Sequence, residues 1–270
     1  MKTLKILTFC AGAIASLLIV TALIDPSTAS PKKDNPPVTG KGFALLELFT
    51  SEGCSSCPTA DDLLAKIQKE SKDKPVYVLA YHVDYWNRLG WKDVFSNAEF
   101  SKRQVAYGQW LNNPQIYTPQ VVINGKAECI GSDEPALRDA ISGALAGTAS
   151  VSIALQVQED KDKLAINYQV TGGSATDRLL IALVQKSAIS KVAAGENSGR
   201  TLAHAQIVRQ LQTVNLNSDK KGTSYIKAPQ GFNPQGWEVV GFIQNTSTGE
   251  VLSANRANLN SNINIKNNTL

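Results

Sequence analysis

Two cysteines separated by two residues are the strongest chemical signal in the sequence. Cys54 and Cys57 follow the apolar run 43–49 and precede a segment of helical periodicity, so we expect them on a strand-to-helix turn. Backbone N–H groups at a helix start lower the pKa of a thiol, and the thiolate is the nucleophile of disulfide exchange. This placement predicts that Cys54 attacks a disulfide and that Cys57 resolves the mixed disulfide.

Two other interpretations of the cysteine pair compete with a redox role. A closed zinc site needs four ligands, and no second Cys pair or Cys/His pair follows in the sequence. A purely structural disulfide that closes so short a loop would contribute little stability. The acids Glu52, Asp61 and Asp62 oppose thiolate formation, so we expect only a moderate lowering of the Cys54 pKa.

The elements around the pair follow a regular order. A second strand is predicted at 76–81, and Ser96 and Glu99 have the spacing of a capping box that starts a helix running to Leu111. Thr118-Pro119 then leads into a strand at 120–123, the turn Asn124-Gly125, a further strand, and a last helix with apolar positions from Ala136 to Leu145.

Strand, Cys-x-x-Cys, helix, strand, helix, Thr-Pro, strand, turn, strand and helix together resemble the thioredoxin superfamily. The resemblance implies that Pro119 is cis and lies opposite Cys54, with the Thr118 backbone free to pair with an incoming peptide. It also implies that Glu47 moves protons to and from Cys57; the alternative is a paired or outward-facing strand carboxylate. The stretch from residue 43 onward looks more specifically like a secreted bacterial thioredoxin-like family labelled as a domain of unknown function.

The sequence also departs from the thioredoxin pattern. Gly53 precedes Cys54 where thioredoxin carries tryptophan, and the dipeptide Ser55-Ser56 indicates no direction of electron flow. We interpret His82 as hydrogen-bonded within the fold; the alternative is a metal ligand acting with the two cysteines. Cys129 lies in an apolar context that favours a buried small side chain over a third redox thiol.

From residue 149 onward the period of the apolar residues changes to two. Residues 151–157 and 164–170 alternate cleanly on either side of a charged turn, which predicts a hairpin. Four further strands are expected, with a short helix at Gln206–Leu211, and the 195–200 segment and His204 are interpreted as loop without catalytic geometry. The predicted fold class is therefore an α/β thioredoxin-like domain followed by a β-rich, sandwich-like C-terminal domain.

The first residues predict export. Lys2 and Lys5 precede an apolar run and a small-residue stretch, so residues 1–29 are expected to be a signal peptide that carries Cys10 away; an uncleaved anchor is the alternative. The predicted organisation is then a linker at 30–42, a thioredoxin-like domain at 43–148, a β-rich domain at 149–257 and a disordered tail at 258–270. The expected location is periplasmic or secreted, where disulfides persist.

Composition narrows the function classes. The 270 residues carry a net charge of +4 with 19% charged residues, which argues against a nucleic-acid-binding protein, and beyond the signal segment no membrane association is expected. The prediction is an exported thiol–disulfide oxidoreductase that needs no cofactor and acts on exported protein thiols or disulfides with a redox partner. The alternatives are a thiolate-based copper or zinc handling protein and a redox-inactive interaction module.

Overall fold

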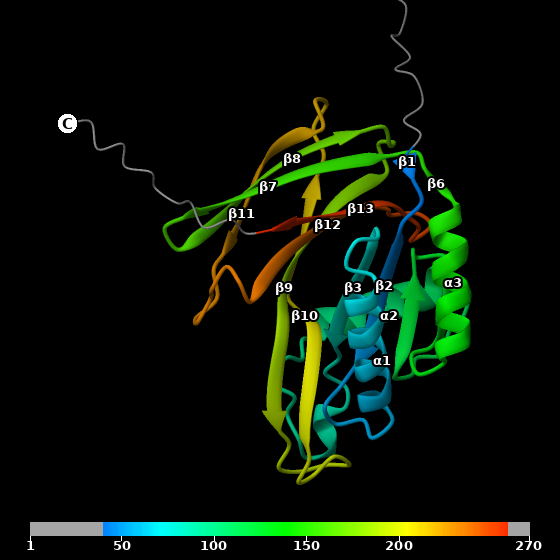
Figure 1. Cartoon of the computed structure of the whole chain (residues 1–270), viewed down its shortest axis with the longest axis vertical. Helices are drawn as coiled ribbons and strands as arrows, with labels where there is room; N and C mark the ends of the chain where they lie inside the picture. Colours follow the sequence, from blue (N-terminus) through cyan, green and yellow to red (C-terminus); the bar gives the residue numbers. More distant parts are fainter. Residues whose placement is uncertain (1–39, 259–270) are drawn as a thin grey trace, which may run out of the picture. The chain divides into compact units, whose positions relative to one another are not determined.

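A computed structural model describes residues 40–258 of the 270, and its main feature is one eight-stranded sheet of order β13-β12-β9-β10-β3-β2-β4-β5 (Figure 1). In its N-terminal part β2 (Ala44–Thr50) pairs in parallel with β3 (Val76–His82). On its other side β2 pairs antiparallel with β4 (Gln120–Ile123), which pairs with β5 (Ala127–Ile130). The predicted strands of this half are confirmed.

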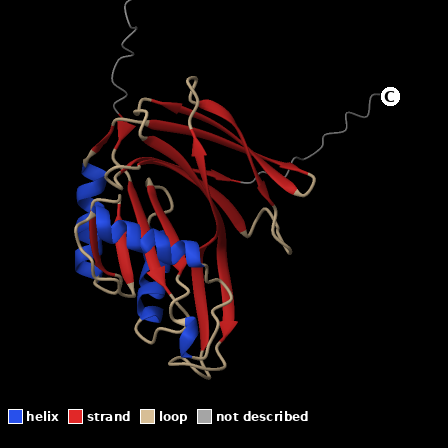
Figure 2. Ribbon diagram, turned by 180° about the vertical axis from the view of Figure 1, so that it is seen from behind, coloured by secondary structure: helices blue, strands red, loops and turns tan. Residues whose placement is uncertain are grey.

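The helices cover both faces of this part of the sheet (Figure 2). On one face, α1 (Cys57–Glu70) and α3 (Glu134–Ala146) pack on a core that includes Leu46 and Leu48 of β2. On the other, α2 (Ala98–Trp110) packs on a core that includes Leu45 and Phe49. Because side chains alternate along a strand, β2 supplies both cores and is buried along its whole length. A short 3-10 helix, η1 (Asn87–Leu89), lies between β3 and α2.

The C-terminal half of the chain extends the same sheet and adds a second one. Strands β9 (Asp177–Lys191), β10 (Thr201–Asn215), β12 (Trp237–Asn245) and β13 (Val251–Asn258) continue the eight-stranded sheet. Strands β7 (Ser152–Asp160), β8 (Lys163–Thr171) and β11 (Lys221–Lys227) form a three-stranded sheet that shares an apolar core with β9 and β12. Short β1 (Gly40–Lys41) and β6 (Thr148–Ala149) pair with each other.

The main sheet joins the two segments that were expected to be separate domains. Strand β10 lies parallel to β3, with Ile207 opposite Ala80, and the described residues belong to one compact unit. The result is a mixed α/β fold with a large sheet and few helices. This differs from the expected arrangement because the predicted boundary between residues 148 and 149 falls at β6 while the sheet continues across it.

Three local predictions were wrong, and one of them is the interpretation of His204 as a loop residue, since it lies in β10. Residues 206–211 are not a helix; they belong to β10, where Gln206 has a positive φ of 55° and the register with β9 shifts between Val208 and Gln210. This irregularity breaks the two-residue alternation and gives the apolar residues a helix-like spacing. The cap of α2 is Asn97, whose side chain accepts from the Glu99 N–H at 3.0 Å, while the Ser96 hydroxyl bonds to the Asp93 carbonyl.

The predicted signal peptide at 1–29, most of the linker at 30–42 and nearly all of the tail at 258–270 lie outside the described residues. Of the linker, Gly40 and Lys41 form β1, and Asn258 ends β13. Within residues 40–258 we find no helix with the length and apolar character to cross a membrane.

A buried ion pair ties α2 to the sheet. Arg103 of α2 donates to both Glu47 carboxylate oxygens, at 2.6 and 2.9 Å, and its side chain is only 8% exposed. The Tyr107 hydroxyl also donates to Glu47, and Gln244 of β12 accepts from Arg103 at 3.1 Å. The Arg103 guanidinium therefore connects β2 and α2 with a strand from the C-terminal half of the chain.

We predict that Arg103→Met lowers the free energy of unfolding by about 3–5 kcal/mol, because it leaves the Glu47 carboxylate buried without its cation. Urea denaturation monitored by circular dichroism measures the change. Lys102→Met is the matched control, since the Lys102–Glu99 pair is exposed and its loss should leave the unfolding free energy nearly unchanged. Equal effects of the two substitutions would contradict the assignment of Arg103 as a buried anchor.

Candidate functional site

The cysteine pair lies on the turn between β2 and α1, as predicted. Cys54 and Cys57 are joined in a disulfide, and α1 begins at Cys57 with Ser56 as its N-cap residue. The Cys57 N–H donates to the Cys54 carbonyl at 3.2 Å, and the Cys54 N–H donates to the Ser51 carbonyl at the same distance. The sulfur of Cys54 lies 3.4 Å from the Ser56 hydroxyl. The disulfide therefore spans the last turn before the helix.

Thr118 and Pro119 lie directly against this turn. The Thr118–Pro119 peptide bond is cis, and the Thr118 carbonyl oxygen is 3.8 Å from the Cys54 sulfur. The Trp86 indole N–H donates to the Thr118 hydroxyl at 2.8 Å. Trp86 also packs beside Gly53, where an added Cβ would lie 3.1 Å from the Trp86 Cβ. The structure thus brings Cys54, Cys57 and the Thr118-Pro119 pair together.

Glu47 lies elsewhere. Its carboxylate faces the α2 side of the sheet, where it pairs with Arg103 and Tyr107, whereas α1, which begins at Cys57, packs on the opposite face against Leu46 and Leu48. This geometry corresponds to the paired strand carboxylate rather than to a proton carrier for Cys57, because the sheet separates the two groups.

A loop from the distant β9–β10 connection covers the turn. The Asn197 side-chain amide donates to the carbonyls of Glu52 and Cys54, both at 2.9 Å, and the Glu196 carboxylate accepts from the Ser55 N–H at 2.9 Å. Asn197 is fully buried, and Cys54 is 1% exposed. The 195–200 segment is a loop, as predicted, and it is hydrogen-bonded to the backbone of the disulfide turn. We therefore expect the loop to limit the access of a reacting thiol to Cys54.

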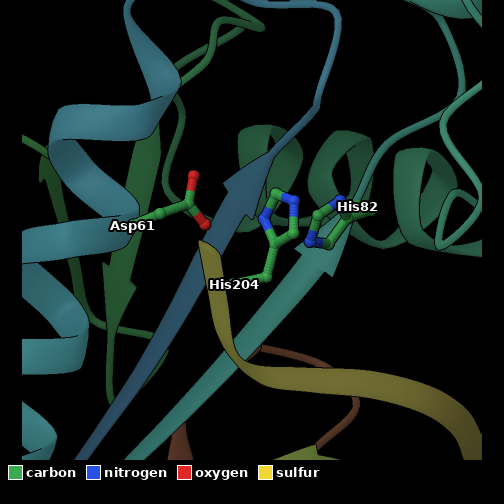
Figure 3. A group of neighbouring side chains, drawn as sticks. All are labelled: Asp61, His82 and His204. Carbon is green, nitrogen blue, oxygen red and sulfur yellow. The ribbon is translucent and has the colours of Figure 1, made fainter. Parts of the chain in front are cut away.

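A cluster of buried polar side chains lies beside the turn. It is formed by residues of helix α1 and of strands β3 and β10. Asp61 of α1, His82 at the end of β3 and His204 of β10 point toward one another (Figure 3). One atom of each that could bind a metal ion, a ring nitrogen or a carboxylate oxygen, lies within 4.8 Å of the others. Their exposed fractions are 6%, 0% and 5%. The centroids of the two imidazole rings are 5.0 Å apart.

Two further carboxylates hold the histidine rings. Asp93 lies 2.7 Å from His82 Nδ1, and its same oxygen accepts from the Glu52 N–H at 2.9 Å. Glu52 lies 3.5 Å from His204 Nε2 and accepts from the Trp91 indole at 2.7 Å. The backbone of Glu52 is part of the disulfide turn, so the polar cluster and the turn share a residue.

The environment shifts the pKa values of this cluster in different directions. Burial raises the pKa of Asp61. Burial lowers the pKa of His82, but the charge and hydrogen bond of Asp93 outweigh it, so the pKa is raised. Burial also raises the pKa values of Glu52 and Asp93, yet each is lowered on balance, chiefly by its histidine partner. Asp93 and Glu52 are therefore ionised at neutral pH.

Sequence reasoning missed Asp61 and His204. Asp61 was interpreted only as a carboxylate near a helix start, and His204 as a loop residue. One signal was available: the sequence contains two histidines in all, and both lie in this cluster. His82 is hydrogen-bonded within the fold, as the preferred interpretation held, and its second ring nitrogen faces the cluster.

Comparison with known proteins places the chain in a family. Residues 45–244 match the model of the family described as protein of unknown function (DUF1223). The chain belongs to the DUF1223 family. From the sequence we expected a family labelled as a domain of unknown function, and this match supports that part of the expectation. The match makes no assignment to the thioredoxin superfamily. No curated protein matches the chain.

A solved structure agrees with the fold of this DUF1223 protein. A crystal structure of a protein from Agrobacterium tumefaciens is 26% identical, with a TM-score of 0.61, covering 81% of this chain and 95% of that one. A domain of an outer membrane lipoprotein from Porphyromonas gingivalis is 15% identical, with a TM-score of 0.27, covering 42% of this chain and 89% of that one. The first of these supports a mixed α/β fold with a large sheet.

The third cysteine of the described region lies apart from the pair. Cys129 of β5 is half-buried and packs against the α1-side core, opposite Val121 of β4. Burial, with the nearby charges of Asp133 and Glu128, raises the pKa of the Cys129 thiol to about 11. At neutral pH this sulfur is a protonated thiol with little nucleophilic character.

We predict that Cys129 of this DUF1223 protein alkylates slowly near neutral pH. Because its pKa is raised to about 11, its thiolate forms only as the pH increases, and its rate with iodoacetamide should rise about tenfold per pH unit until the pH approaches that value. Peptide mapping by mass spectrometry, on protein with its disulfide intact, follows the reaction at Cys129. Rapid alkylation that levels off near pH 8.5 would refute this prediction.

We predict that Asn197→Ala makes the disulfide react faster with a small dithiol. The substitution removes two buried hydrogen bonds that hold the loop on the Cys54 turn, each contributing about 1 kcal/mol, so reduction by dithiothreitol should accelerate by about tenfold or more. Stopped-flow fluorescence or timed alkylation measures the rate. Ser198→Ala is the matched control, because Ser198 is an exposed residue of the same loop whose side chain donates to the Ala193 carbonyl and not to the disulfide turn. Identical rates in wild type and Asn197→Ala would mean that the loop does not limit access.

Proposed function

We propose that this protein is an exported thiol–disulfide oxidoreductase that acts on protein thiols through Cys54 and Cys57. The observation that carries the proposal is the disulfide on a strand-to-helix turn, with the carbonyl oxygen of a residue that precedes a cis proline 3.8 Å from the Cys54 sulfur. In the thioredoxin pattern that the sequence resembles, this juxtaposition places the reactive sulfur beside a backbone edge for the substrate peptide. The order of elements from β2 to α3 supports the same resemblance.

The reaction involves two pairs of sulfur atoms and two protons, which the two thiols of the reduced protein release. In the reduced protein the Cys54 thiolate attacks one sulfur of a partner disulfide, the partner S–S bond breaks, and one partner thiolate leaves. The Cys57 thiolate then attacks the Cys54 sulfur, the mixed disulfide breaks, and the second partner thiolate leaves. Two electrons pass to the partner, which becomes a dithiol after taking up two protons. The reverse sequence transfers the disulfide to a substrate dithiol.

The position of Cys54 at the turn suits it to the attacking role. Its sulfur lies 3.8 Å from the Thr118 carbonyl oxygen on the turn before α1, whereas Cys57 is the first residue of the helix. Trp86, in the loop after β3, packs against Gly53, and its indole bonds to Thr118 beside the disulfide turn. Thioredoxin instead has a tryptophan at the position directly before its first cysteine. The predicted export of the chain would place this pair where disulfides persist.

Trapping of mixed disulfides tests this proposal. Cys57→Ser should accumulate a covalent adduct between Cys54 and an oxidised, unfolded protein substrate, because the resolving thiol is missing. Cys54→Ser should accumulate at least tenfold less, because the buried Cys57 thiol does not reach the substrate. Non-reducing electrophoresis and mass spectrometry measure the adduct.

The control for this experiment is Cys129→Ser, which should trap no adduct and leave the exchange rate of the Cys54/Cys57 pair unchanged. The reduction potential of the pair, measured against glutathione, reports whether it donates or removes disulfides. The proposal fails if Cys57→Ser forms no adduct through Cys54 with either protein or glutathione disulfides. That result would favour the redox-inactive interaction module.

A further inference from the structure

The cluster of Asp61, His82 and His204 contains buried polar atoms that the protein itself leaves unpaired. Among residues 40–258, Asp61 Oδ1, His82 Nε2 and His204 Nδ1 have no hydrogen-bond partner. An unpaired buried donor or acceptor costs about 1–3 kcal/mol, so buried polar atoms are normally paired. Here three such atoms occur, one on each of three side chains that point toward one another (Figure 3).

The second polar atom of each of these side chains has a hydrogen-bond partner, which fixes the orientation of the side chain. Asp61 Oδ2 accepts from the Thr50 hydroxyl at 2.8 Å, which leaves Oδ1 directed into the cluster. His82 Nδ1 is 2.7 Å from Asp93. His204 Nε2 is 3.0 Å from the Ser190 hydroxyl and 3.5 Å from Glu52.

These partners also determine which ring nitrogen carries a lone pair. A carboxylate beside one imidazole nitrogen favours the proton on that nitrogen, so the other nitrogen becomes a metal-ligating acceptor. Asp93 therefore directs the lone pair of His82 to Nε2, and Glu52 directs that of His204 to Nδ1. Both are the ring nitrogens that lack a hydrogen-bond partner. Carboxylate–histidine pairs of this kind are typical of the surroundings of metal ions in proteins.

The buried negative charge around the cluster also favours a bound cation. Three carboxylates, of Asp61, Glu52 and Asp93, lie at or beside a pair of imidazoles in the protein interior. Buried carboxylates need a compensating positive charge. A divalent cation between the three side chains provides it without protonating either histidine.

We propose that Asp61, His82 and His204 bind one divalent transition-metal ion, with Zn²⁺ as the ion best suited to the site. Two imidazole nitrogens and one carboxylate oxygen form a common protein ligand set for zinc and leave a fourth tetrahedral position. Ligand atoms bound to one zinc ion lie roughly 3–4 Å apart. Ligand atoms of the three side chains, one from each, lie within 4.8 Å of one another, so small side-chain movements complete the site.

The ion would fasten three elements that are far apart in the sequence. Asp61 lies on α1, His82 on β3 and His204 on β10, so the ligands come from both halves of the chain. The disulfide cysteines are not among the ligands. The site is therefore independent of the proposed thiol–disulfide exchange, and it differs from the metal site of two thiolates and His82 that the sequence suggested as an alternative.

Metal binding is tested on the full chain with its disulfide intact, so that Cys54 and Cys57 cannot act as thiolate ligands. After treatment with a chelator and addition of Zn²⁺, gel filtration followed by elemental analysis should recover one zinc per chain. Co²⁺ added in place of zinc should give visible d–d absorption without a thiolate-to-cobalt charge-transfer band. Recovery of no bound zinc from folded wild-type protein would overturn the proposal.

Ligand variants locate the site. Asp61→Asn, His82→Gln and His204→Gln should each weaken zinc binding by more than about 100-fold in competition with a chromophoric chelator, because each removes a direct ligand. Phe95→Leu is the matched control: its ring packs on both imidazoles, at 5.1 and 5.4 Å between centroids, but offers no ligand atom. It should retain zinc affinity within a few-fold.

A second control separates this site from one built on thiolates. The double variant Cys54→Ser/Cys57→Ser should retain one zinc per chain, whereas a thiolate site would lose it. Should a ligand variant fail to fold, thermal unfolding of the wild type decides, since zinc should raise its midpoint by several degrees at saturating concentration. An unchanged midpoint, or undiminished zinc affinity in folded Asp61→Asn, would contradict the proposal.

Discussion

The parallel pairing of β10 with β3 is the constraint on which the candidate site depends. It adds a strand from the C-terminal half to the edge of the sheet formed by the N-terminal half, with Ile207 opposite Ala80. An unpaired sheet edge carries unsatisfied backbone groups, and β10 covers that edge of β3. The same pairing brings His204 beside His82 and carries the β9–β10 connection to the disulfide turn. The apolar core crosses this junction, with Val208 and Tyr81 in one cluster.

Buried charge is handled differently on the two faces of the sheet. On the α2 face, Glu47 receives hydrogen bonds from Arg103 and Tyr107, so that its carboxylate is fully paired. On the α1 face, the Asp61, His82 and His204 cluster keeps one unpaired atom on each side chain. The first arrangement is complete as it stands and acts as a structural anchor. The second has the form of an incomplete coordination shell, which is why we assign a ligand to it.

The position of the disulfide suits thiol–disulfide exchange, but its burial limits access to the sulfur atoms. The helix start and the Thr118 carbonyl place Cys54 in a geometry suited to exchange, yet Asn197 and the loop around it leave the residue 1% exposed. The carboxylate of Glu52 lies on the same turn and disfavours a negative sulfur. In the function that we propose, the loop must therefore open before a partner reaches the sulfur.

The sequence by itself determined the local elements of the N-terminal half and the position of the cysteine pair, because apolar periodicity and the Cys-x-x-Cys spacing act over short distances. Patterns could not assign Glu47 to a face, since every residue of β2 is buried and both faces are apolar. The irregularity at Gln206 similarly imitated a helix. Only the tertiary structure decided that β10 joins the sheet and that His204 meets His82 and Asp61. Such contacts depend on the pairing of strands distant in sequence, which no local pattern encodes.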